Sequence, residues 1–231
     1  MNRIVIALLA LAPVCVSAAE WKGEGELGYT STAGNSDAET LNAKLAVTVE
    51  YDQWKHVLGL SALQASSNKV RSAERYEFTH KSNYAYSDKS YVFASLRYDN
   101  DQFSGYDYQS SLAAGIGSQL IKTAVHSLDV AVGPGYRSMQ DSVTGQVDNR
   151  VILKLDAQYA YQISEYASLS EVLTVESGSD NTYTESITSL KMKINGNLSS
   201  KISYTIKQNS VVPVGTERTD TLTSVSLVYG F

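Results

Sequence analysis

Apolar and polar residues alternate along most of the chain, and the last stretch shows the pattern most clearly. From Thr221 to Phe231 every second position becomes steadily more apolar, ending with Tyr229 and Phe231, while the positions between include two serines and a glycine. A period of two places the two sets on opposite faces of a β-strand. A soluble domain seldom ends on such a strand, because chain ends fray in water. The pattern is typical of the closing strand of an outer-membrane barrel, whose outward face meets lipid.

The same alternation recurs upstream and predicts about twelve antiparallel strands in up-and-down order. Leu41 to Tyr51 is the clearest, because Leu41, Leu45 and Val49 lie on one face and polar residues on the other. The expected strands are residues 21–29, 41–51, 54–65, 75–86, 91–98, 108–120, 128–136, 151–161, 169–175, 183–194, 198–208 and 219–231. Which residues between 167 and 194 face outward stays open, because Glu171 and Thr174 interrupt the two alternative sets of apolar positions in this segment.

Short turns alternate with longer loops between these strands. Asp52-Gln53 and Asn195-Gly196 are tight turns, and residues 137–149 form the longest expected loop. Outer-membrane barrels alternate short periplasmic turns with longer outside loops and have an even strand count. Lipocalins and β-sandwiches also alternate, but they seldom produce so many nearly equal hairpins with tyrosines at the strand ends. The sequence therefore predicts an all-β, transmembrane antiparallel barrel, and the sixteen tyrosines favour strands.

The first residues predict a cleaved secretory signal. Arg3 is followed by an apolar run from Ile4 to Val16 and by small residues up to Ala19. This run is shorter than the ~20 residues that a membrane-spanning helix needs. We therefore expect a signal peptide at residues 1–19, a barrel at 20–231 and a location in the bacterial outer membrane. The single cysteine, Cys15, would leave with the signal.

The charge balance excludes one class of partner. The chain carries 19 basic and 24 acidic residues, a formal net charge of −5, which argues against nucleic acid. We expect outer-membrane lipid around the barrel and recognition of the last strand, ending at Phe231, by the barrel assembly machinery. No cofactor is expected, and the oligomeric state is left open.

Charged residues on the polar faces are the candidate functional residues, because they would line the interior of the barrel. The lumen-lining candidates are Lys44, Glu50, Arg75, Glu77, Lys81, Arg97, Asp129, Arg137, Arg150, Lys154, Asp156, Lys201 and Lys207. Two interpretations are open: the charges line a pore that filters by charge, or they pair across the lumen and stiffen a small barrel. A barrel of about twelve strands lies between filled eight-stranded barrels and open porins.

The sequence predicts no enzyme and no metal site. None of the three histidines, His56, His80 and His126, is placed with a serine or a carboxylate pair in a way that the sequence supports as a hydrolase site. Asp99, Asn100, Asp101 and Asp107 form an acidic group that lacks the spacing of a calcium loop, so a solvated polar loop is the favoured interpretation.

Several phrases of the sequence are not generic to barrels. They are WKGEGELGYTSTAGNSD at 21–37, FSGYDYQ at 103–109, GPGYR at 133–137, SGSDNTY at 177–183 and NSVVPVGTERTDT at 209–221. Together they resemble the YdiY-like family of salt-induced outer membrane proteins, domain-of-unknown-function family 481. The resemblance covers the chain after the signal. It implies an outer-membrane barrel and a link to salt stress, and it implies no catalytic residue.

Three functions follow as hypotheses from these observations. The first is a narrow channel for ions or small polar solutes, with the lumen charges as its filter. The second is a closed barrel that strengthens the envelope or binds a surface partner through its outer loops. The third and least favoured is a barrel hydrolase acting at the outer rim.

Overall fold

The computed structural model describes residues 19–32, 38–68, 70–102, 104–212 and 215–231, and its regular elements are all strands. The expected signal peptide at residues 1–19 lies almost wholly outside this range. The strands are β1 (Glu20–Thr32), β2 (Ala38–Tyr51), β3 (Trp54–Ser67), β4 (Val70–Ala85), β5 (Ser90–Asp101), β6 (Tyr106–Lys122), β7 (His126–Asp141), β8 (Val147–Gln162), β9 (Ala167–Gly178), β10 (Thr182–Asn195), β11 (Leu198–Asn209) and β12 (Thr219–Gly230). No helix in the described part of the chain is long and apolar enough to cross a membrane.

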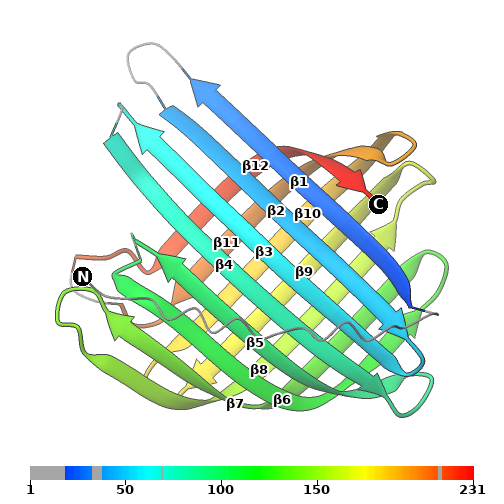
Figure 1. The fold of residues 1–231 in the computed structure, drawn as a ribbon, viewed down its shortest axis with the longest axis horizontal. Helices are drawn as coiled ribbons and strands as arrows, with labels where there is room; N and C mark the ends of the chain where they lie inside the picture. The colour runs from blue at the N-terminus through cyan, green and yellow to red at the C-terminus, as the bar shows by residue number, and fades with distance from the viewer. Residues whose placement is uncertain (1–18, 33–37, 69, 103, 213–214) are drawn as a thin grey trace.

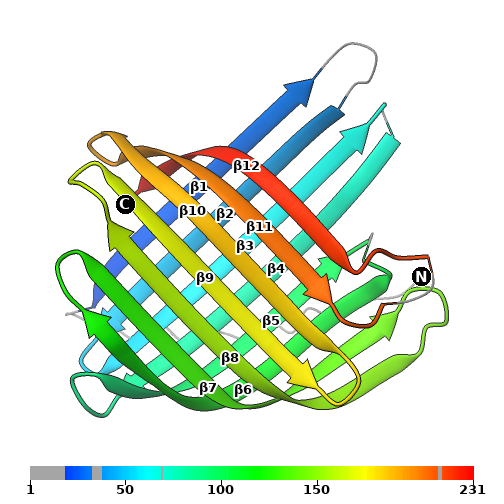
Figure 2. The same ribbon diagram turned by 180° about the vertical axis from the view of Figure 1, so that it is seen from behind.

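The strands form one closed antiparallel barrel, which confirms the predicted fold class. Each strand pairs with its neighbours in the sequence, and β12 pairs with β1 to close the ring. Figure 1 shows the wall that contains β1–β4, and Figure 2 shows the opposite wall with β8–β11 in front. All strands are strongly tilted, as closure of a barrel requires. The tight turns and both ends of the barrel chain, Glu20 and Phe231, lie at one end, which we call the short-turn end.

The alternation of the sequence becomes an apolar outside and a polar inside. Val151 and Leu153 of β8 are 73% and 55% exposed, whereas Lys154 and Asp156 of the same strand are buried in the interior. The last strand follows its prediction: Val225, Leu227 and Tyr229 face outward. Large apolar side chains can face outward without a core behind them only where the surroundings are themselves apolar.

Several strands continue further than the sequence predicted. The expected loop at 137–149 is only 142–146, because β7 reaches Asp141 and β8 begins at Val147. Asp99 and Glu176 were placed in loops and instead lie in β5 and β9. The backbone hydrogen bonds between strands continue beyond the apolar band. Outward residues there are polar, so the sequence no longer alternates between apolar and polar positions and the strand ends could not be predicted. The strands are therefore 12 to 17 residues long.

Pairing settles the facing of β9 and β10, which the sequence left open. Glu176 is the partner of inward-facing Lys154, so Glu176 faces the lumen and Glu171, five positions earlier, faces outward. In β10, Tyr183 is buried inside, and Thr184 and Ser186 alternate to the outside. The ambiguity arose because Glu171 interrupts the outward apolar face of β9, and because the outward face of β10 is polar from Thr182 to Thr188.

The seam between β1 and β12 is the shortest ladder of the barrel. Five residue pairs join these strands, from Glu24↔Gly230 to Gly28↔Ser226, whereas thirteen join β1 and β2. Phe231 extends the seam with two backbone hydrogen bonds to Gly23, of 2.8 and 2.9 Å. Its ring lies over Gly23, where an added Cβ would be 2.3 Å from the ring atoms. The terminal residue therefore closes the seam at the short-turn end.

Replacing Gly23 should weaken this closure. We expect Gly23→Val to displace the Phe231 ring and lower the free energy of unfolding by about 1–3 kcal/mol, the usual cost of overpacking. Urea unfolding in lipid vesicles, followed by tryptophan fluorescence, measures the change. The matched control is Gly25→Val on the same strand and face, where an added Cβ meets nothing within 4 Å. Equal stability of the two variants would contradict a closing role for Phe231.

Candidate functional site

The interior of the barrel contains a cavity at its short-turn end. Its volume is about 900 Å³, and residues of two short turns, including Asp52 and Asp88, line it. The cavity therefore opens where these turns lie and extends inward along the strands. Charges of both signs line its wall, among them Lys55, Lys81 and Asp129. A cavity with such a wall suits water, ions and small polar solutes better than apolar ligands.

One part of the cavity wall is aromatic. Tyr91 and Phe93 of β5 face inward and pack with Ala113 and Ala131. The strands beside them carry inward glycines, and at Gly117 an added Cβ would lie 2.2 Å from the Tyr91 ring. The missing side chain makes room for the ring. Tyr91 is held by a 2.5 Å hydrogen bond from its hydroxyl to Asp129.

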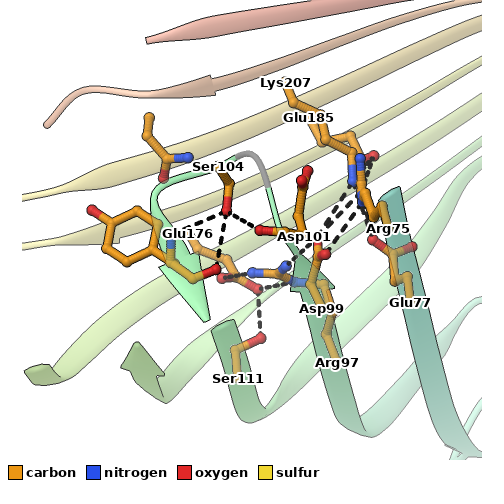
Figure 3. Close-up of polar contacts among 12 residues, drawn as sticks. Arg75, Glu77, Arg97, Asp99, Asp101, Ser104, Ser111, Glu176, Glu185 and Lys207 are labelled. Atoms are coloured by element: carbon orange, nitrogen blue, oxygen red, sulfur yellow. Dashed lines mark hydrogen bonds and ion pairs between the residues drawn. The ribbon is translucent and has the colours of Figure 1, made fainter. Parts of the chain in front are cut away.

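A cluster of ion pairs crosses the lumen and forms the inner part of the cavity wall; Figure 3 shows part of it. It comes from seven strands and consists of Arg75, Glu77, Lys81, Arg97, Asp99, Arg137, Lys154, Asp156, Glu176, Glu185 and Lys207. We call these residues the charge cluster. Several of its contacts cross the lumen: Lys207 Nζ of β11 is 3.1 Å from Glu77 Oε2 of β4. The cluster therefore bridges opposite walls and narrows the passage.

Glu176 is the centre of one half of the charge cluster. Its side chain is fully buried, and Arg97 Nη2 is 2.9 Å from Oε2. The Ser111 hydroxyl donates to Oε1 at 2.7 Å, and Lys154 Nζ lies 3.5 Å from the same oxygen. The Arg97 guanidinium also lies over the Tyr183 ring, 4.4 Å from its centroid. A buried carboxylate persists in its charged form only when it is paired and hydrogen-bonded in this way.

The other half of the charge cluster joins β4, β10 and β11. Lys207 Nζ is 3.0 Å from Glu185 Oε1, and Arg75 Nη2 is 2.9 Å from Glu77 Oε2. Asp99 connects the two halves, because Arg75 Nη2 lies 3.2 Å and Arg97 Nη1 3.6 Å from its Oδ2 (Figure 3). The whole cluster is thus one network, and a change at one member alters the partners of the next.

Asn181 ties the long loops to the charge cluster at the far end of the lumen. Its backbone carbonyl accepts a 3.1 Å hydrogen bond from Arg137, a fully buried side chain. Its Oδ1 accepts from the Ser210 hydroxyl and the Val211 backbone N–H, both at 3.2 Å. The Tyr106 hydroxyl donates to the Val211 carbonyl at 3.4 Å. These contacts tie Ser210 and Val211, which follow β11, to Asn181 between β9 and β10 at the long-loop end, and we call these three residues the cap.

The thirteen candidates from the sequence fall into four groups, all on the inward side of their strands. The charge cluster contains Arg75, Glu77, Lys81, Arg97, Arg137, Lys154, Asp156 and Lys207. Lys44 and Lys201 lie near the seam between β1 and β12. Lys201 forms an ion pair with Glu26 of β1, and Lys44 of β2 is the ladder partner of Glu26. Glu50 and Asp129 line the cavity, and Arg150 lies at the rim of the long-loop end, paired with Asp148 and Asp180.

Three acidic members of the charge cluster were not among the candidates. Glu176 and Asp99 were placed in loops, and Glu185 lies in the strand whose facing was ambiguous. The sequence did contain a signal that inward acidic residues were missing from the candidates. Nine of the thirteen candidates are basic, and buried cations need acidic partners. The expected solvated loop around Asp99 was wrong, since Asp99 is buried among arginines.

The three histidines lie away from the charge cluster. His56 and His80 stack with a centroid distance of 5.9 Å on β3 and β4, and the Ser82 hydroxyl contacts both rings. His126 begins β7 and stacks on Tyr161 at the short-turn end. The described residues contain no group of three or more histidine, cysteine, aspartate or glutamate side chains placed to hold a metal ion.

Comparison with known proteins agrees with this architecture. A family model described as "Protein of unknown function, DUF481" matches residues 25–231. The chain belongs to the DUF481 family. A relative, the uncharacterized protein YdiY of Escherichia coli (strain K12), is 29% identical over 211 residues, which cover 90% of this chain and 82% of YdiY. The family resemblance predicted from the sequence is therefore confirmed.

Solved structures share the fold of this DUF481 protein. An outer membrane channel from Pseudomonas putida F1 superimposes with a TM-score of 0.54 over 91% of this chain and 95% of that one, at 10% identity. The NanC porin gives a TM-score of 0.50 over 91% and 98% of the two chains, at 14% identity. At these identities the likeness shows the fold alone, which is a barrel of the outer-membrane type.

Breaking the charge cluster should destabilise the barrel. We expect Arg97→Gln to lower the free energy of unfolding by about 3–5 kcal/mol, because it leaves Glu176 buried with fewer partners. Urea unfolding in vesicles measures the loss. Arg150→Gln is the matched control, since its ion pairs lie at the solvated rim and should contribute little. A small effect of Arg97→Gln would show that water already reaches Glu176.

Proposed function

We propose that this DUF481 protein is a narrow outer-membrane channel for ions or small polar solutes, in which the charge cluster is the filter. The observation that carries the proposal is the continuous polar interior: a cavity of about 900 Å³ opens at the short-turn end and leads to the charge cluster. An envelope barrel whose only task is mechanical gains nothing from such a cavity. The outward apolar band supports a place in a lipid bilayer.

The charge cluster supports selection of small and charged species. Six cations and five anions face one another within it, so a passing ion can exchange one set of contacts for another. Within the charge cluster, side chains bridge the lumen. Rotamer changes of Lys207 or Lys81 therefore suffice to alter its width, and these occur far faster than movement of a strand.

A second candidate function, a closed structural barrel, is favoured by the full burial of Arg137 and Glu176. Such burial gives rigidity and excludes water. The two functions differ in one measurement, the ionic conductance of the protein in a planar bilayer. Small, stable steps support the channel; a folded barrel with no steps supports the closed barrel. Enzymatic activity is not part of either proposal.

The filter should respond to loss of a charge in the cavity. Lys81 lines the cavity and lies 3.3 Å from Asp156, so Lys81→Gln leaves that carboxylate less well paired. We expect the permeability ratio of cations over anions to rise, measured as a shift of reversal potential in a salt gradient. Lys22→Gln is the control, because Lys22 is 71% exposed at the end of β1 and is not part of the cavity wall. An equal shift in both variants would contradict filtering within the cavity.

The cap should control how often the channel opens. Asn181→Ala removes the side-chain contacts to Ser210 and Val211 but keeps the carbonyl that Arg137 uses. We expect more frequent or longer openings in single-channel records, with ion selectivity unchanged. Asn149→Ala, at an exposed position of β8, serves as the control. Unchanged gating in Asn181→Ala would mean that the cap does not limit passage.

Several expectations about the cellular context belong to the same proposal. We infer that residues 1–19 are removed on export and that the protein resides in the bacterial outer membrane. Fractionation of the membranes would check the location, and the mass of the recovered protein would check the removal. Recognition of β12 by the assembly machinery stays a prediction, to be checked by deleting Phe231. The link to salt stress implied by the family stays a prediction that growth of a deletion strain at high osmolarity would check.

A further inference from the structure

One part of the outward face, formed by Glu171 of β9 and the first half of β10, differs from the rest of the barrel. Every second residue of β10 from Thr182 to Thr188 faces outward, and all four are hydroxyl residues. Beside them Glu171 of β9 faces outward, with Oε1 accepting from Ser186 at 2.6 Å and Oε2 from Thr188 at 2.5 Å. We call Glu171 and these four residues of β10 the polar strip. On β8, directly next to it, the outward residues are apolar, as in Val151 and Leu153.

The polar strip lies at a depth where lipid is a poor neighbour for it. Glu171 is four residues beyond Ala167, the first residue of β9, and Thr188 is level with it in the ladder. Charged side chains on the lipid face of a barrel are unfavourable toward the middle of the membrane. The two hydroxyls satisfy part of the carboxylate, which has about four acceptor sites. The remaining acceptor capacity requires a donor that lipid tails do not supply.

The opposite wall presents such a donor at a similar depth. His80 lies five residues before Ala85, the last residue of β4, and faces outward with its partner Leu58. Ser82 Oγ is 2.8 Å from His56 Nδ1 and 3.3 Å from His80 Nε2. If His56 donates to Ser82 and Ser82 donates to His80 Nε2, the N–H of the His80 imidazole is on Nδ1 and available to a neighbour. This wall is therefore complementary to the polar strip in hydrogen bonding.

We propose that copies of this chain associate side by side in the membrane, with Glu171 of one copy accepting a hydrogen bond from His80 of the next. Pairing of two polar strips by a two-fold axis would bring two carboxylates together, which is unfavourable. Contact between different walls avoids this. The small hydroxyl side chains of β10 allow close approach of the neighbouring wall, as small residues do between membrane helices.

The position of the two walls determines the form of the assembly. In the closed ring of twelve strands, β4 and β9 are separated by five steps in one direction and seven in the other. They therefore lie on nearly opposite sides of the barrel, as Figures 1 and 2 also show. A contact between opposite walls repeats from copy to copy and produces a row, not a compact trimer. The His80 wall also carries an open hollow of about 440 Å³, bordered by Leu45, Leu60 and Tyr76, into which a neighbour can pack.

Cross-linking in native outer membranes tests this arrangement. In a Cys15→Ser background, the chain carries Leu190→Cys on the β10 side and Ala94→Cys on the β5 side, both outward-facing and clear of the proposed hydrogen bond. A flexible bismaleimide should give a ladder of dimers, trimers and longer species. The matched control chain carries Leu190→Cys with Val225→Cys of β12, another outward position, and should give none.

Removing the proposed hydrogen bond should remove the ladder. We expect Glu171→Leu or His80→Leu to reduce cross-linking about tenfold, the loss expected for one hydrogen bond to a charged group. The shift of the folded barrel in unheated gels confirms that each variant folds. An unchanged ladder in Glu171→Leu, a ladder from the Leu190/Val225 chain, or no ladder from the Leu190/Ala94 chain would each overturn the proposal. Because no conductance is measured, the result is independent of the proposed channel.

Discussion

Closure of the backbone ladder is the constraint on which the rest of this structure depends. A barrel with an apolar outside has no water to satisfy an open strand edge, so every backbone donor and acceptor along the band must pair within the sheet. The seam between β1 and β12 meets this requirement with the shortest ladder in the barrel. The ring of Phe231 over Gly23 and its two backbone bonds complete the seam. Closure therefore rests on a glycine and on the last residue of the chain.

Once the ring is closed, inward side chains from opposite walls meet. A ring of twelve strands is narrow enough for long side chains such as Lys207 and Glu77 to touch across the lumen. Paired charges cross the lumen at the inner end of the cavity, and the cavity opens toward the short-turn end. The interior therefore contains a network of paired charges and a polar cavity that this network borders.

The outside of the barrel is also divided. Most of it is an apolar band, but one wall carries the carboxylate of Glu171 and the opposite wall carries the stacked His56 and His80. Both polar sites are linked to hydroxyls on a neighbouring strand, which keeps their side chains near the wall. Association between these walls would leave the lumen of each copy unchanged. The proposed passage through a barrel and the proposed contact between barrels therefore rest on separate parts of this DUF481 protein.

The sequence by itself determined the strands, their up-and-down order and most of their facing, because a period of two survives wherever one face is apolar and the other is not. It also placed thirteen charged residues on the inward side of the wall. It failed where a charged residue interrupts the outward apolar face, as Glu171 does in β9, and where that face is polar, as in the first half of β10. It also failed where the ladder runs past the apolar band, as at Asp99 and Glu176. Only the tertiary structure decided which charges are partners. Lys207 and Glu77 are 130 positions apart, and the closed ring, not the local pattern, brings them to 3.1 Å.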